Sequence, residues 1–341
     1  MTMTEKSELS PASSTRRTRG AARLSSMNLH DFGLLGALLL LVCVYAIIAP
    51  NFLTEFNLLN VLRQVSIVAI AAVGMTTVIL IAGIDLSVGS TVAFSGTLAA
   101  LFLTERTEIG VIAVLIAVTI AVLAGAGVGL LNGLIIGLLG VPAFIATLAT
   151  LTGVRGFALL LTEAKPVSVP VGDYSWLGTG HIGPLPVPVL IMALVFFIGY
   201  VLLSRMKIGR RIYAVGGNES AARLSGVRVT RLILFVYIFA GACTGLAGCL
   251  ASARLSSGQP AGFIGFELDV IAAVVVGGTS LMGGRGRLSG TFFGALLIGV
   301  LGNGLTLMDV QTYWKQILTG IVIVVAIVVD GIIRRRGSQA S

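Results

Sequence analysis

The chain has 341 residues, of which 56% are hydrophobic and only 11% are charged. Soluble domains carry about 25% charged residues, so this composition excludes an ordinary soluble protein and places most of the chain in lipid. The net charge of +9 does not indicate a nucleic-acid partner, because the basic residues are grouped at the two chain ends, in one central loop and in one glycine-rich turn, as at the cytoplasmic ends of membrane helices.

In chain order, residues 1–26 are rich in Ser, Thr and Arg and predict a disordered, basic cytoplasmic tail. Residues 27–336 form the predicted membrane domain, and residues 337–341 form a second cytoplasmic tail. Apolar stretches that could cross a membrane, the third of them short for a full span, are found at 32–49, 58–82, 91–103, 109–138, 143–161, 186–203, 231–251, 267–282, 290–307 and 314–333. The sequence therefore predicts an all-α integral membrane protein of about ten transmembrane helices.

The basic residues also predict the orientation of these helices. If the N-terminus is inside and the helices alternate, most of the 23 Lys and Arg residues fall on inside segments, as the positive-inside rule requires. Both termini are then cytoplasmic. The three cysteines lie separately within apolar runs, so neither a disulfide framework nor a metal site is predicted.

A weak internal repeat favours two duplicated halves. The tetrapeptide IAAV occurs at 70–73 and again at 271–274, and a glycine-interrupted turn follows each copy, at 83–90 and at 283–290. Many transporters are built from such halves, with broken segments in matching positions along the pathway. Four residues can also match by chance in so apolar a chain, so both interpretations stay open.

The first turn, GIDLSVGS at 83–90, places a carboxylate and two hydroxyls between two apolar stretches. An Asp at the bilayer centre costs about 2.5 to 3.5 kcal/mol on insertion scales, so Asp85 should face a cavity or cap a helix. Asp85 or Ser87 could cap a helix that starts near Val88, and the same groups could line a pathway. The two roles are compatible.

Glycines also mark a packing face. Gly125, Gly129, Gly133 and Gly137 recur every fourth residue and lie on one face of a helix, where a second backbone can approach closely. The same device recurs at Gly241 and Gly245. These residues are interpreted as structural.

The predicted cytoplasmic loop at 204–230 contains a short helix of about two turns. Asn218 is a suitable N-cap, Glu219 suits the positive end of the helix dipole and pairs with Arg223 at i, i+4, and Gly226 is a natural stop. With its small residues Ala221 and Ala222, such a short, rigid helix could seat in the cleft of a soluble partner. An ordinary basic loop is the alternative.

Signatures of catalysis are absent from the sequence. None of the four lysines follows a glycine, so there is no Gly-x-x-x-x-Gly-Lys phosphate loop, and there is no His-Glu-x-x-His or Gly-x-Ser-x-Gly motif. Glu267 and Asp269 point to different helix faces and are read as first-turn acidic residues. We therefore expect no enzyme activity, no cofactor and no ATP site in this chain, so any ATP is hydrolysed by another subunit.

Four motifs carry a resemblance to a family. The segments 73–90 (VGMT to GIDLSVGS), 216–226 (GGNE to RLSG), 253–260 (ARLSS to QP) and 267–281 (ELD to GGTSL) resemble the ribose-type permeases of bacterial ABC importers, in the same order. The resemblance covers residues from about 50 to 330. It implies a permease in the bacterial plasma membrane that imports a small sugar, with ribose as the favoured substrate. Permeases for other monosaccharides, inositol, nucleosides or a furanosyl signalling molecule look similar, so these substrates are the alternatives.

The resemblance further implies a second permease copy, a cytoplasmic ATPase and an extracytoplasmic sugar-binding protein, besides the surrounding lipid. It makes Gly217, Asn218, Glu219, Ala221 and Arg223 the coupling helix that docks on the ATPase. Candidate pathway or gate residues are Asp85, Ser87, Ser90, Thr279 and Ser280. An ion-coupled secondary transporter is the main rival, but it would usually show more ionisable residues within the spans than Asp85.

Overall fold

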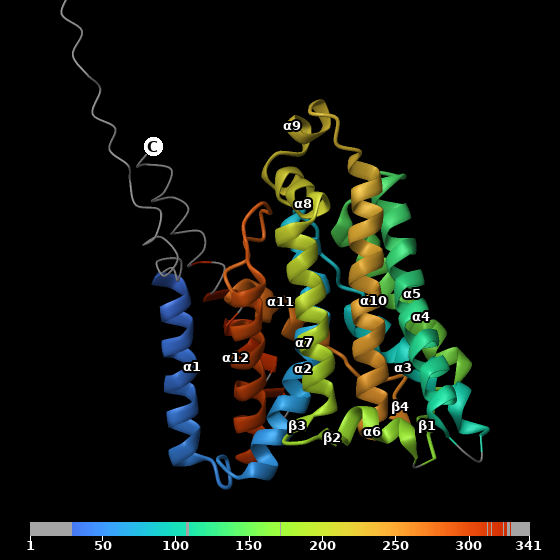
Figure 1. Cartoon of the computed structure of the whole chain (residues 1–341), viewed down its shortest axis with the longest axis vertical. Coiled ribbons are helices and arrows are strands. Elements are labelled where there is room, and N and C mark those ends of the chain that lie inside the picture. Colours follow the sequence, from blue (N-terminus) through green and yellow to red (C-terminus); the bar gives the residue numbers. More distant parts are fainter. Residues whose placement is uncertain are drawn as a thin grey trace, which may run out of the picture.

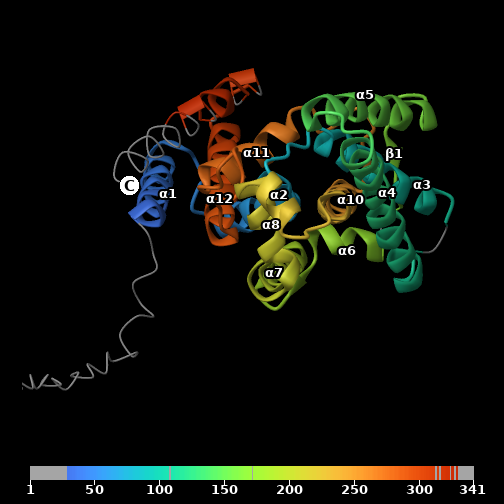
Figure 2. The same ribbon diagram turned by 90° about the horizontal axis from the view of Figure 1, so that it is seen from above.

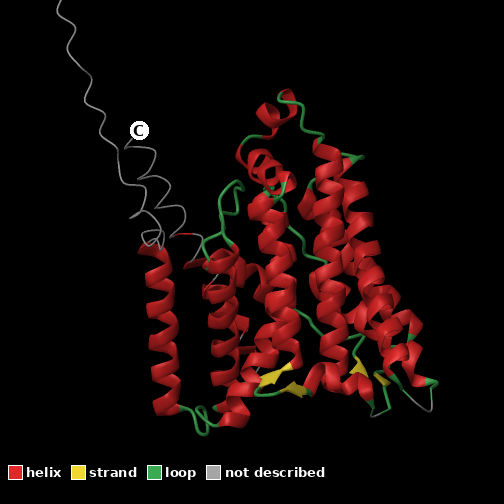
Figure 3. Ribbon diagram, viewed as in Figure 1, coloured by secondary structure: helices red, strands yellow, loops and turns green. Residues whose placement is uncertain are grey.

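The computed structural model of the chain describes residues 29–106, 109–170 and 172–311, and beyond them residues 313, 314, 316–322, 324, 325 and 328. The two predicted tails, 1–26 and 337–341, lie outside the described residues. The described chain is mostly helical, and its few strands are two residues long and gather at one end of the molecule (Figure 3). The predicted all-α class is confirmed.

The elements follow the apolar stretches closely. In chain order they are α1 (Leu29–Ile48), α2 (Glu55–Leu80), α3 (Val88–Thr104), α4 (Val111–Gly137), α5 (Ala143–Leu161), β1 (Val167–Ser168), α6 (Asp173–Thr179), β2 (His181–Ile182), β3 (Leu185–Pro186), α7 (Val187–Tyr200), the π-helix η1 (Val201–Arg205), α8 (Lys207–Gly217), α9 (Glu219–Leu224), α10 (Val229–Leu255), β4 (Ser257–Gly258), α11 (Phe266–Val276) and α12 (Leu288–Leu307).

Six helices of the described chain are long and apolar enough to cross a membrane: α2, α4, α5, α7 continued by η1, α10 and α12. The apolar parts of α1 and α3 are shorter, as expected for the third stretch. The predicted span at 267–282 is wrong in extent. Its helix, α11, has 11 residues, which rise about 16 Å, roughly half of the hydrocarbon core. Ten membrane spans are therefore not confirmed among the described residues, and the last stretch, 314–333, is described only in part.

The helix α11 stops early because glycines follow it. Gly278, Gly283 and Gly284 adopt positive φ angles, which few other residues tolerate, and the chain runs without helix until α12 begins at Leu288. The first half of the chain contains a similar interruption at 81–87, between α2 and α3. We call 81–87 the first break and 277–287 the second break.

The two ends of the helix bundle differ. All four strands and α6 lie at one end, where β1 pairs with β4 and β2 with β3, and α8 and α9 project from the other (Figure 1). The end with α8 and α9 also carries the second break, because Tyr213 of α8 contacts Gly286. Most basic residues between 205 and 287 therefore share this end, as the positive-inside argument expects. We call it the α8–α9 end.

The core lies around α10. Seen from above, α10 lies between α2 and α4, with α5 and α7 on opposite sides (Figure 2). The predicted glycine face is confirmed: a Cβ on Gly125 would meet the backbone of Gly241 and Gly245, and a Cβ on Gly129 would meet the carbonyl of Tyr237. The two helices thus approach at a distance that only glycine permits.

Both copies of the IAAV repeat are buried next to a break. Residues 70–73 lie in α2 and residues 271–274 in α11, and none of these eight side chains is more than 5% exposed. Each helix then ends and gives way to a break. The repeat therefore marks two similar local structures, and duplication of the whole fold stays a prediction.

Candidate functional site

The predicted short helix is α9, at the tip of the α8–α9 end. Asn218 is its N-cap, and its side-chain oxygen accepts the N–H of Ala221 at 2.9 Å. Glu219 and Arg223 form an exposed ion pair with an N···O distance of 2.7 Å. The helix ends at Leu224, and Gly226 follows with a φ of +82°. These local predictions are confirmed, although α9 has six residues rather than two full turns.

The tip of α9 offers a small surface to a partner. Gly217 is the last residue of α8, and a Cβ there would meet open space. Ala221 is exposed, and the side chain of Leu224 is 90% exposed. A single exposed Leu is normal on a protein surface, so docking of α9 on a partner stays a prediction from the sequence.

Sequence reasoning missed the helix α8, which carries α9. Its inner face consists of Gly209, Ile212 and Val215, spaced three residues apart and buried, whereas Lys207 and Arg210 are exposed. The spacing of these residues is the signal that could have revealed an amphipathic helix. The cluster of basic residues in this segment had predicted a loop instead.

The end of α8 contacts both the end of α2 and the second break. The hydroxyl of Tyr213 donates a hydrogen bond to the carbonyl of Gly286 at 3.0 Å. The N–H of Gly284 donates to the carbonyl of Leu80 at 2.9 Å. Gly216 lies against both partners, so that a Cβ on it would collide with them. A movement of α8 would therefore displace residues next to both the first and the second break, which come from opposite halves of the chain.

The Tyr213 hydroxyl remains a donor at neutral pH. Burial raises the pKa of Tyr213 above its ordinary value of 10.0, and the positive charge of Arg287 acts in the opposite direction. Since the net shift is upward, the hydroxyl keeps its proton well beyond physiological pH.

The first break meets α9 across a cavity of about 360 Å³. Glu219 and Arg223 line it from α9, and Ile81 and Gly83 line it from the first break. Tyr237 of α10 lines the same cavity and donates its hydroxyl hydrogen to the carbonyl of Ile84 at 3.0 Å. The ion pair of α9 thus faces the segment that leads to Asp85.

Asp85 closes the turn that leads into α3. Its Oδ1 atom accepts the backbone N–H of Ser87 at 2.9 Å and the hydroxyl of Ser87 at 2.6 Å, and the Ser90 hydroxyl donates to the carbonyl of Ser87 at 2.8 Å. α3 begins at Val88, as predicted, but the predicted capping by Ser87 is wrong, because the side chain of this N-cap residue makes no capping hydrogen bond and bonds to Asp85 instead. All three polar residues are buried, so in this conformation they stabilise the break and line no open channel.

Asn132 of α4 belongs to this network and was not predicted. Its amide donates to the hydroxyl of Ser87 at 3.0 Å, while its Oδ1 atom is buried and lacks a hydrogen-bond partner within the described chain. The sequence signal that could have found it is a single amide side chain within the apolar, glycine-rich stretch 109–138. A polar side chain within a membrane span needs a hydrogen-bond partner, so such a residue marks a contact.

Thr279 and Ser280 lie on the second break and are likewise buried. The N–H of Ser280 donates to the carbonyl of Arg285 at 2.9 Å, and Thr279 packs against Gly286. The predicted site residues therefore form two groups, Asp85, Ser87 and Ser90 on one break and Thr279 and Ser280 on the other. The structure joins the two breaks at the end of α2, where Gly283 lies against Ala82.

A second polar region lies on the face formed by α5 and the start of α11. Arg155 donates to the carbonyls of Pro260 and Gly262, the former at 2.9 Å. Glu267 and Asp269 occupy the first turn of α11, as predicted, and are only partly buried. Charged side chains that stay partly exposed along a membrane helix favour a face turned toward water or another subunit rather than lipid.

Comparison with known proteins identifies the class of this chain. Residues 57–327 match the family model described as the permease component of branched-chain amino acid transport systems. The chain belongs to this permease family. It is 44% identical to the ribose import permease of Haemophilus influenzae over 298 residues, and 46% identical to that of Bacillus subtilis over 295 residues. Each alignment covers 86% of this chain, with 91% and 90% of the respective relative.

A more distant relative is the L-arabinose transport system permease of Escherichia coli, at 35% identity over 302 residues, 88% of this chain and 90% of the relative. No solved structure shows significant similarity to the chain. The family and the six helices long enough to span make the permease a multi-pass protein of the bacterial inner membrane.

Proposed function

We propose that this permease is the membrane subunit of an ATP-driven importer for ribose. The relatives named as ribose permeases share 44 to 46% of their residues with it, whereas those named for D-allose and L-arabinose share 36% and 35%. Transport of another small polar solute, such as xylose, inositol or a nucleoside, is the alternative, because substrate choice in such systems rests largely with the binding protein.

The observation that carries the mechanism is the contact of α8 with the two breaks. The tip of α9 is exposed for a partner, and α8 connects that tip through Tyr213 and Gly216 to Gly284, Gly286 and the end of α2. A displacement of α9 by a few ångströms is therefore passed to both interrupted helices. In many transporters interrupted helices form the substrate site, around which the two halves rock between outward- and inward-open states.

The proposed cycle needs two further proteins. An ATPase on the α8–α9 end closes when it binds ATP and moves α9, and a binding protein delivers the sugar to the opposite end, where the strands and α6 lie. We propose that the permease itself binds no ATP and has no enzymatic activity, since its sequence contains no phosphate loop.

A second permease copy completes the proposed pathway. The face with Arg155 and Glu267 supports this, and on α5 a Cβ at Gly153 or Gly156 would meet open space. Small residues on an open helix face allow close approach of another helix. We place the second copy and the import pathway on this face.

The test is transport in proteoliposomes with labelled ribose. We expect uptake only when the permease, the ATPase, the binding protein and ATP are all present. The same vesicles, supplied from outside with labelled arabinose or xylose and the corresponding binding protein, serve as the control for the substrate. ATP-independent accumulation by the permease alone under an ion gradient would instead identify a secondary transporter.

A further inference from the structure

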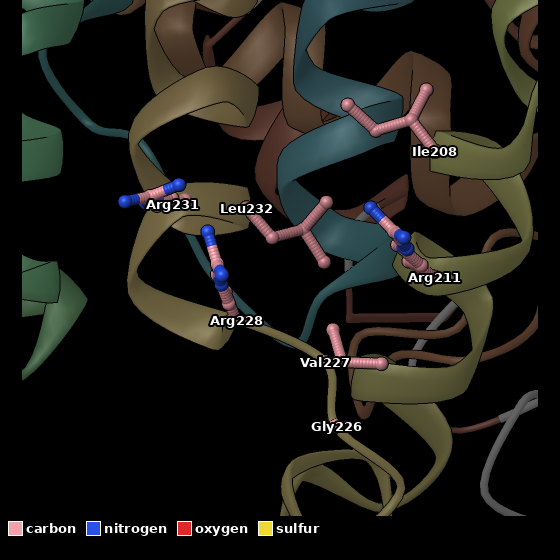
Figure 4. A pocket seen from close by; sticks show the side chains of 7 residues that line it. All are labelled: Ile208, Arg211, Gly226, Val227, Arg228, Arg231 and Leu232. Carbon is pink, nitrogen blue, oxygen red and sulfur yellow. The ribbon is translucent and has the colours of Figure 1, made fainter.

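A basic pocket of about 420 Å³ lies between α8 and the start of α10. Figure 4 shows its lining, with Arg211 on α8 and Arg228 and Arg231 on the other wall. The remaining lining residues are Ile208, Gly226, Val227 and Leu232. The pocket is next to the coupling helix but separate from its ion pair.

The three arginines have no acidic partner in the part of the chain that the structure describes. Arg211, Arg228 and Arg231 are all exposed and enter no ion pair there, and the acidic residue nearest in sequence, Glu219, is paired with Arg223. Three positive charges around one cavity repel each other until an anion binds. The planar guanidinium groups match the oxygen atoms of a phosphate, to which they can donate paired hydrogen bonds.

The position of the pocket favours a lipid phosphate over a soluble one. α10 is one of the helices able to cross the membrane, and Arg231 and Leu232 lie in its first turn. From Arg231 the same helix face continues to Phe235 and Phe239, about 6 Å and 12 Å deeper along the axis. These two rings are partly exposed and stack with a centroid distance of 6.3 Å.

The pocket thus combines a basic upper rim with an apolar stripe below it. A phospholipid has the same order, with an anionic headgroup above an acyl chain. A cytoplasmic protein would match the arginines but would leave the two phenylalanines without a partner. We propose that the pocket binds the phosphate of an anionic phospholipid of the cytoplasmic leaflet, with one acyl chain along Phe235 and Phe239.

Native mass spectrometry of the purified full-length permease with added phosphatidylglycerol tests this proposal. Two basic residues near a membrane surface each contribute about a factor of five to the binding of anionic lipid, so R228Q/R231Q should bind phosphatidylglycerol roughly 25-fold more weakly. The matched control is R205Q/R210Q, which removes two exposed arginines outside the pocket and should bind as the wild type does. Phosphatidylcholine should not distinguish the variants.

Further arms separate the sources of the anion. F235A/F239A should weaken the binding of phosphatidylglycerol, although all the arginines stay in place. Millimolar inorganic phosphate should not displace the lipid from the wild type. Displacement by phosphate would show a site for a free anion and overturn the proposal. An equal loss of lipid binding in R205Q/R210Q would also overturn the proposal. So would wild-type lipid binding by R228Q/R231Q together with loss of assembly with the ATPase, because the pocket would then belong to a protein interface.

Discussion

Tyr213 and Gly286 are 73 residues apart in the chain and are joined by a hydrogen bond of 3.0 Å from the tyrosine hydroxyl to the glycine carbonyl. Tyr213 lies on α8, which leads into the exposed helix α9, and Gly286 lies in the second break. This bond is a direct polar link between α8 and the second break.

Replacement of Tyr213 by Phe removes this link and retains the ring. A single hydrogen bond contributes about 0.5 to 1.5 kcal/mol, so we expect ribose-stimulated ATPase activity and uptake to fall by about 2- to 12-fold while the protein stays inserted. Tyr200→Phe is the control, because Tyr200 is exposed on α7 and donates no hydrogen bond within the described chain. Equal losses in both variants would contradict a specific role for Tyr213.

Reversal of charge at Glu219 should uncouple the ATPase from transport. The exposed pair with Arg223 and the helix dipole each contribute only a few tenths to about 1 kcal/mol, so the thermal stability of Glu219→Arg should be close to that of the wild type. Stimulation of the ATPase by loaded binding protein should be lost. A matched control is Glu163→Arg, which breaks a similar exposed pair with Lys165 at the other end.

The roles of Asp85 as a turn-closing residue and as a pathway charge can be separated. Asp85→Asn keeps an oxygen that can accept from Ser87, whereas Asp85→Ala keeps none. If the side chain acts by closing the turn, the Asn variant transports nearly as well as the wild type. The Ala variant should lose about 1 to 3 kcal/mol of stability, measured as reduced yield and melting temperature. Well-folded Asn variants without transport would favour the pathway role.

The contact between α4 and α10 predicts that substitution of two glycines in α4 changes the stability of the protein to different extents. A Cβ at Gly129 would meet the backbone of Tyr237, so Gly129→Ala should destabilise the protein by about 1 to 3 kcal/mol. A Cβ at Gly127 would meet open space, so Gly127→Ala should be neutral or slightly stabilising. Thermal unfolding in detergent compares the two. A similar loss in both would show that the close approach is not required.

The orientation can be tested by labelling in intact cells. Single cysteines replace Ser220 and Lys165, both exposed and at opposite ends of the bundle, in a chain without Cys43, Cys243 and Cys249. The Lys165→Cys variant should react with an impermeant thiol reagent, and the Ser220→Cys variant should react only after the cells are opened. Reaction of both from outside would contradict a cytoplasmic α8–α9 end.

Much of the local structure was predictable from the sequence. The ends of most apolar helices, the start of α3 at Val88 and the N-cap at Asn218 agree with the expectations. They are predictable because capping and helix interruption depend on residues within one or two turns. The extent of α11 was not predictable from the sequence, because the apolar composition continues past Val276 whereas the backbone turns at Gly278.

The sequence by itself determined that the protein lies in the membrane, where most of its apolar helices run and that glycine-containing turns interrupt the chain at two places, because apolar runs, intramembrane polar groups and glycines act locally. Only the tertiary structure decided which interruptions meet. The contacts of Gly216 with Leu80 and Gly284, and of Ser87 with Asn132, join segments that are 45 to 136 residues apart. No local pattern specifies them, since they arise only when whole helices pack and leave glycine-sized gaps between their backbones.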